Sequence, residues 1–138
     1  MTTNAASAGK YGAAYSTVRR RVRPLSALID DARLSHIDFL KIDVEGAEAD
    51  VIAGLDFARH RPRVILVEAV NPNASADEWK AWDKTLGANG YIFAFFDNLN
   101  RFYVAAECQA LAPLFPKQSL PWEAAAHLWD HGRSAART

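Results

Sequence analysis

The chain has 138 residues, half of them hydrophobic and 23% charged, and its sixteen basic side chains balance sixteen acidic ones. This length is enough for one domain with a hydrophobic core. The balanced charge argues against a global electrostatic field that recruits nucleic acid or an anionic membrane. No apolar run in the sequence approaches the roughly 20 residues that span a bilayer. We therefore expect a single-domain protein that binds neither nucleic acid nor membrane.

The N-terminus and the cysteine content bear on the compartment. Residues 1–12 lack the apolar core of a secretory signal. A single cysteine, Cys108, excludes an internal disulfide framework and fits a reducing environment. We therefore expect a cytoplasmic protein. Residues 1–16 are rich in Ala, Ser, Thr and Gly without hydrophobic pattern, which predicts a disordered segment.

A short extended segment and a helix come next in the chain. Residues 18–23 carry four arginines, too few by themselves to indicate a nucleic-acid site, and a solvated strand edge is the interpretation we favour. Pro24 suits the first position of a helix. The helix is indicated by apolar residues at helical spacing, namely Leu25, Leu28, Ile29 and Ala32.

A strand, a helix and a second strand are predicted over residues 37–67. Both faces of the first strand, residues 37–43, are partly apolar, as in a parallel sheet covered by helices. A helix is predicted from about residue 46 to 58. The aliphatic run 64–67 predicts an interior strand.

The next segment has a clear helix start and a hairpin. Ser75 and Glu78 form a capping-box pattern, and the apolar face that follows consists of Trp79, Trp82 and Leu86. Strands are predicted over residues 91–96 and 101–105. Because four residues separate them, these strands form an antiparallel hairpin.

The order of these elements predicts an α/β fold, with parallel strands joined by crossover helices and ending in the antiparallel hairpin. Right-handed crossovers place both helices on the same side of the sheet. We divide the chain into a disordered segment (1–16), a domain (17–110) and a C-terminal tail (111–138), in which about residues 122–131 form a short helix.

Acidic residues follow two of the predicted strands. Ligands of open parallel sheets bind outside the carboxyl ends of the strands, which is where Asp43, Glu45 and Glu68 are expected. A carboxylate there can act as a general base. Glu45 can equally complement the positive end of a helix. Lys41 is interpreted as a structural partner of Asp43 or Glu68.

Carboxylates at two neighbouring strand ends also have the chemistry to hold Mg²⁺, which prefers oxygen ligands. No spacing in the sequence requires this ion, and we assign no metal site.

Three separated stretches resemble one enzyme family. Residues 37–48 read Ile-Asp-Phe-Leu-Lys-Ile-Asp-Val-Glu-Gly-Ala-Glu and look like the hallmark of FkbM-type methyltransferases. Residues 64–68 and 90–104 match the same pattern in the same order, so the resemblance covers roughly residues 18–110. It implies a Rossmann-like fold and S-adenosylmethionine as the cofactor.

The resemblance also implies an activity and a set of site residues. The reaction would be methyl transfer to a hydroxyl of a small-molecule acceptor, a sugar or a natural product. Asp43, Glu45 and Glu68 would line the transfer site, with Asp43 and Glu45 beside the cofactor. Substrate-binding candidates at the hairpin tip are Asp97, Asn98 and Arg101, although turn chemistry also explains the first two.

One motif of the family has no counterpart in this sequence. Such enzymes begin with a strand that ends in a Gly-rich loop against the cofactor, whereas Gly9 and Gly12 follow no predicted strand. The chain thus looks like the C-terminal half of the domain, a partial Rossmann-like fold. The alternative function is a non-catalytic remnant or assembly module. Its open strand edge would be covered by a homodimer partner or by a chain that supplies the N-terminal half.

Overall fold

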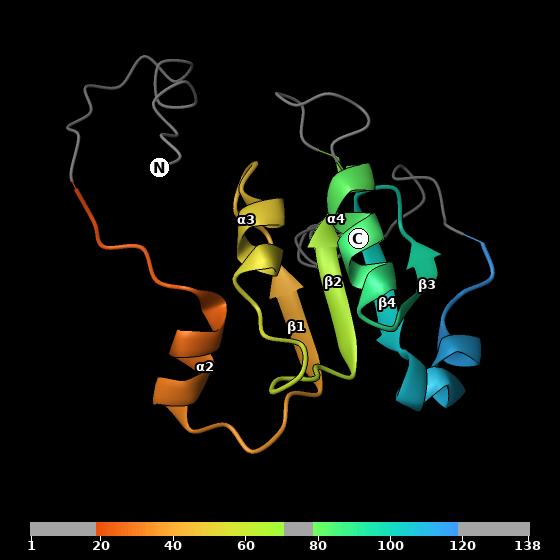
Figure 1. The fold of residues 1–138 in the computed structure, drawn as a ribbon. Helices are drawn as coiled ribbons and strands as arrows, with labels where there is room; N and C mark the ends of the chain where they lie inside the picture. The colour runs from red at the N-terminus through yellow and green to blue at the C-terminus, as the bar shows by residue number, and fades with distance from the viewer. Residues whose placement is uncertain (1–18, 71–78, 119–138) are drawn as a thin grey trace, which may run out of the picture.

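The computed structural model describes residues 19–70 and 79–118. Its elements in chain order are α2 (Leu25–Ala32), β1 (Phe39–Ile42), α3 (Glu48–Ala53), β2 (Val64–Glu68), α4 (Trp79–Ala88), β3 (Tyr91–Phe96), β4 (Asn100–Ala105) and the 3-10 helix η2 (Ala106–Leu114). Figure 1 shows them as one sheet with helices beside it. The predicted segment 1–16, the capping box at Ser75 and the helix near 122–131 lie outside the described residues.

The four strands form one sheet in the order β1-β2-β4-β3. β1 and β2 pair in parallel, and β4 is antiparallel to both β2 and β3. The predicted α/β class and the antiparallel hairpin are therefore confirmed. The second strand of the hairpin, β4, pairs with β2 and separates it from β3. β3 therefore runs parallel to β1 and β2 but does not pair with either. A Rossmann-like topology stays a prediction.

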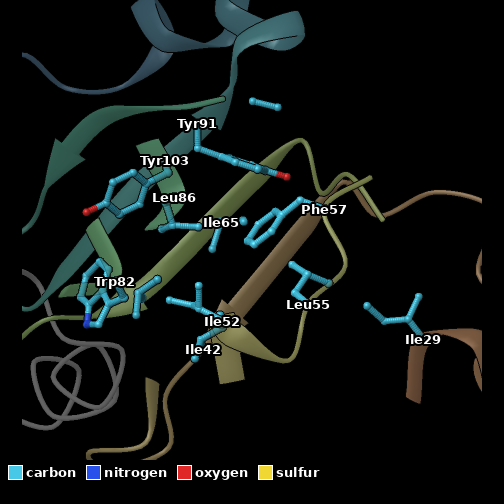
Figure 2. Packing of buried hydrophobic residues seen from close by; sticks show 12 residues of the cluster. Ile29, Ile42, Ile52, Leu55, Phe57, Ile65, Trp82, Leu86, Tyr91 and Tyr103 are labelled. Carbon is cyan, nitrogen blue, oxygen red and sulfur yellow. The ribbon is translucent and has the colours of Figure 1, made fainter. Parts of the chain in front are cut away.

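Helices α3 and α4 contact each other and cover one face of the sheet (Figure 1). Figure 2 shows their buried side chains, Ile52 of α3 and Trp82 and Leu86 of α4, in one cluster with Ile65 and Tyr103 of the sheet. The expectation that both crossover helices lie on one side is confirmed. The apolar positions of α4 read from the sequence, Trp82 and Leu86, are in this core because they fall on the helix face turned toward the sheet.

The predicted helix over residues 46–58 is shorter than expected. α3 ends at Ala53, and the N–H of Gly54 donates to the carbonyl of Asp50. The chain then turns, since the carboxylate of Asp56 accepts the N–H of Ala58 at 3.0 Å. This turn carries Leu55 and Phe57 into the core, whereas a continued helix would follow a straight path. The prediction of helix beyond Ala53 is wrong because tertiary packing overrides the local pattern.

α2 is attached to the turn that follows α3. The hydroxyl of Ser26 accepts the N–H of Asp56 at 2.6 Å, and the N–H of Ser26 donates to the carbonyl of Gly54 at 3.1 Å. Asp30 accepts from Arg59 at 2.7 Å and lies 3.0 Å from His60. The backbone of α2 therefore lies directly against Gly54.

The arginine-rich segment does not extend the sheet. Residues 19–23 are in no strand, and Val22 is 87% exposed. β1 is consequently a terminal strand of the sheet, with Phe39 53% exposed. The strand interpretation of this segment is wrong over its described residues. Among the described helices, none is long and apolar enough to cross a membrane.

Substitution of Gly54 by Ala should destabilise the fold by about 1 kcal/mol, because the new Cβ overpacks a filled space. It would lie 3.2 Å from the backbone nitrogen of Leu25 and 3.3 Å from Cα of Pro24. The φ of Gly54 is −82°, which Ala adopts readily, so lack of space is the cause. Urea unfolding followed by circular dichroism measures the change.

The matched control is Gly87→Ala in α4, where nothing lies within 4 Å of the new Cβ. This variant should be more stable than the wild type by about 0.5–1 kcal/mol, because Ala is the better helix former. A Gly54→Ala chain as stable as the Gly87→Ala chain would contradict the close packing of α2 on the turn.

Candidate functional site

The three predicted acidic residues meet at one edge of the sheet. Ile42 of β1 pairs with Val67 of β2, so the residues that follow, Asp43 and Glu68, lie side by side. One carboxylate oxygen from each of Asp43, Glu45 and Glu68 lies within 4.8 Å of the others. The parallel pairing of the two strands thus creates an acidic cluster, which we define as these three residues.

The turn between β1 and α3 places Glu45 in this acidic cluster. Glu45 and Gly46 have positive φ angles of 56° and 104°, a left-handed conformation that glycine adopts without steric cost. The carboxylate of Glu48 accepts the N–H groups of Val44 at 3.2 Å and Gly46 at 3.1 Å, and Glu48 is buried. α3 begins at Glu48, so Glu45 precedes the first turn of the helix, and its role as a complement to the helix dipole stays a prediction.

Glu48 was not among the predicted site residues. Its carboxylate contacts the backbone of the turn that precedes α3. The sequence contains one signal for this role of Glu48. Gly46, two residues earlier, suits a tight turn whose N–H groups a following carboxylate can accept. Glu48 supports the site and does not line it.

Asp43 and Glu68 differ in their proton affinity. The ammonium of Lys41 lies 2.6 Å from Oδ2 of Asp43 and holds the pKa of this carboxyl below its usual value. Burial raises the pKa of Glu68 from its usual 4.5 to about 7, and the adjacent carboxylate of Asp43 adds to the rise. A carboxyl that titrates near neutral pH can both accept and release a proton under physiological conditions.

The acidic cluster has the oxygen ligands that a divalent cation prefers. Lys41, however, already supplies a positive charge to Asp43 at hydrogen-bonding distance. An incoming ion would compete with this ammonium for the same carboxylate. For that reason we keep the acidic cluster as a proton-exchanging site and assign it no metal.

The hairpin between β3 and β4 lies at the same edge of the sheet. Asn100, the first residue of β4, pairs with Glu68, and the N–H of Ala69 donates to the carbonyl of Leu99 at 2.8 Å. Asn100 was absent from the predicted site residues, since this pairing joins strands that are distant in sequence. The turn chemistry expected for Asp97 is present, because its carboxylate accepts the N–H groups of Leu99 and Asn100.

Asn98 and Arg101 are the other two substrate-binding candidates. Asn98 occupies the hairpin tip with a positive φ of 78°. Arg101 is directed to the other face of the sheet from Asn100, because successive residues of a strand alternate. Its Nε donates to the hydroxyl of Tyr103 at 2.9 Å and one terminal nitrogen donates to Asp83 at 3.2 Å.

The guanidinium of Arg101 also lies over two aromatic rings, 3.9 Å from the centroid of Trp79 and 4.3 Å from that of Phe93. These contacts with α4 and β3 give it a packing role in the fold. A role of Arg101 in acceptor binding stays a prediction.

A groove of about 1020 Å³ lies between β1 and α2 and reaches the turn after β1. One side consists of apolar residues of α2 with Arg20 and Arg23, and the other consists of Leu40, Lys41, Ile42 and Val44 with part of α3. Mostly apolar lining with a few charged groups is typical of small-molecule sites. The groove and the acidic cluster share the carboxyl end of β1.

Comparison with known proteins bears on the same stretch of chain. The sequence matches the model of the methyltransferase FkbM domain over residues 2–93. It is also 31% identical over 119 residues to the AMB antimetabolite synthetase AmbE of Pseudomonas aeruginosa, an alignment that covers 78% of this chain. The chain spans only 5% of the length of that relative. No solved structure gives a significant match.

Titration of the glutamate side chains by carbon-13 NMR should show the Glu68 carboxyl with a midpoint near 7. Glu107 is the internal control, because its hydrogen bonds to Arg61 lower its pKa to about 2. Because folding raises the pKa of Glu68, the folded chain favours the protonated form of this carboxyl. The stability that Glu68 contributes is present below about pH 4.5 and is lost as the pH rises through about 7.

The Glu68→Gln variant should therefore lose part of the pH dependence of the unfolding free energy in this window. A midpoint for Glu68 at its usual 4.5 would contradict the electrostatics of the site.

Proposed function

This chain belongs to the FkbM methyltransferase domain family, and from that membership we propose that it transfers a methyl group from S-adenosylmethionine to a hydroxyl of a sugar or natural product. The family match supports a methyltransferase-like function. The observation that carries the specific proposal is the acidic cluster of Asp43, Glu45 and Glu68 at the carboxyl edge of the sheet. This edge is where ligands of parallel sheets bind.

The residues present fit the chemistry of this cofactor. S-adenosylmethionine, when bound, supplies a methyl group on a positively charged sulfur and carries two ribose hydroxyls. Asp43 and Glu45 are the residues that would hold it, since carboxylates accept hydrogen bonds from hydroxyls and attract a cation. The neighbouring groove of about 1020 Å³ has apolar walls and basic residues at Arg20 and Arg23.

Glu68 is the residue that we propose as the general base. Its raised pKa means that it accepts a proton from an acceptor hydroxyl more readily than an ordinary carboxylate does. Asp43, held as an anion by Lys41, would orient that hydroxyl by accepting a hydrogen bond. The hairpin tip with Asp97 and Asn98 lies at the same edge and is the proposed acceptor side of the site.

Calorimetric titration with S-adenosylmethionine should show micromolar binding by the wild-type chain, a typical affinity for a cofactor. Asp43→Asn should weaken this binding roughly tenfold, since it removes one charge-assisted contact worth about 1.5 kcal/mol. S-adenosylhomocysteine, which lacks the positive charge, should lose less affinity on the same substitution.

Asp38→Asn is the matched control, because Asp38 precedes the same strand at its opposite end and pairs with Arg63 on the surface at 3.1 Å. It should bind the cofactor as the wild type does. Absence of binding by a folded wild-type chain would contradict the proposal for the chain by itself.

The open edge of β1 favours a second candidate function, an assembly module whose sheet is completed by another chain. β1 is a terminal strand of the described sheet, and both Phe39 of this strand and Val44, which lines the groove, are exposed. Unpaired apolar edges of this kind recruit further strands. A second copy of the chain or a chain that supplies an N-terminal half would cover this edge.

Sedimentation velocity tests the homodimer form of this candidate. The wild-type chain should sediment as a dimer, and Phe39→Lys should shift it to the monomer, because a charge on an edge strand opposes pairing. The control is Ile92→Lys on the other terminal strand, where the residue replaced has similar exposure, 46% against 53% for Phe39. A control that dissociates equally would place the interface elsewhere.

A further inference from the structure

Lys41 forms an exposed ion pair with Asp43, a member of the acidic cluster. Lys41 and Asp43 are two residues apart in and after β1, so their side chains lie on the same face of the sheet. Their charged atoms are 2.6 Å apart, and the side chains are 54% and 35% exposed. Exposed pairs contribute little to stability. Stability alone therefore gives no reason for this lysine between the apolar residues Leu40 and Ile42.

The surroundings of Asp43 distinguish this pair from the one at the other end of β1. Asp38 there contacts Arg63 and His36, both basic. Asp43 instead lies beside a second carboxyl, that of Glu68, with one oxygen of each within 4.8 Å of the other. Two carboxyls this close do not readily ionise together, so one of them keeps a proton, because two adjacent negative charges repel.

The local charges decide which of the two carboxyls keeps this proton. Lys41 contacts Asp43 directly, and its electrostatic attraction to Glu68 is the weaker one. On the other side, Glu45 in the turn and Glu48 at the start of α3 repel a negative charge on Glu68. The β4 residue paired with Glu68 is Asn100, which is uncharged.

We propose that Lys41 is a positioning residue of the transfer site: by holding Asp43 as an anion, it assigns the shared proton to Glu68. Its part in methyl transfer rests on the proposed function, whereas the assignment of the proton is a property of the folded chain alone. The reaction would start from the form in which Glu68 has released its proton to solvent, a form that its pKa of about 7 makes accessible. The acceptor O–H bond breaks and its proton forms an O–H bond on Glu68, while the acceptor oxygen would bond to the methyl carbon and the sulfur would keep the electron pair of the broken S–C bond. Solvent later takes the proton from Glu68. Asp43 stays ionised throughout and orients the hydroxyl.

Carbon-13 NMR titration of the Asp and Glu carboxyls tests this assignment without substrate or cofactor. In the wild type, Asp43 should titrate below its usual range and Glu68 near 7. In Lys41→Met, the Asp43 midpoint should rise by about one pH unit or more, because a full charge at contact distance is lost. Both carbons should then report the same two titration steps, as expected for a proton shared evenly.

Lys41→Arg is the rescue variant, and its Asp43 midpoint should return to the wild-type value because the positive charge is restored. A purely structural role of Lys41 would leave the titration of a folded Lys41→Met chain unchanged, and that result overturns the proposal. Failure of Lys41→Arg to restore the midpoint overturns it as well. Lys41→Gln, read in the same way, replaces the Met variant if the latter does not fold.

Calorimetry with S-adenosylmethionine on the wild type separates the two proposals. If the midpoints shift in Lys41→Met but the wild type does not bind the cofactor, the proposed function is contradicted and the role of Lys41 is supported. Cofactor binding by the wild type, together with unchanged carboxyl midpoints in Lys41→Met, would support the proposed function and overturn the role of Lys41.

Discussion

The parallel pairing of β1 with β2 is the constraint on which the site depends. Two strands that run in the same direction end at the same edge, so the residues that follow each strand are brought together without any contact of their own. Asp43 and Glu68, 25 positions apart in the chain, become neighbours for this reason. The repulsion between their charges is tolerated because hydrophobic packing on the helix-covered face holds the strands in register.

The helix-covered face and the carboxyl edge of the sheet differ in chemistry. The face under α3 and α4 carries the apolar cluster of Figure 2, and there even a guanidinium, that of Arg101, is used for packing against Trp79 and Phe93. The carboxyl edge carries the acidic residues, the turn closed by Glu48 and the hairpin. A rigid core with a polar edge is how a small domain holds charged groups close together while water still reaches them.

Family membership and site geometry bear on function at different levels. The match over residues 2–93 identifies the domain family. The electrostatics of Asp43 and Glu68 indicate which groups can exchange a proton, and this follows from burial and charge alone. The groove beside β1 belongs to both candidate functions, since it is next to the proposed cofactor residues and to the open edge of the sheet.

The sequence by itself determined the elements whose signals are local. Short apolar runs located the strands and helical spacing located α4 to within a few residues, and a short loop identified the hairpin. Tertiary structure alone decided what depends on distant neighbours. α3 ends at Ala53 because the following turn packs Leu55 and Phe57 into the core. Asn100 lies beside Glu68 because β4 pairs with β2. The high proton affinity of Glu68 follows from its burial. Burial and cross-strand register arise only when segments far apart in the chain pack together, so no local pattern contains them.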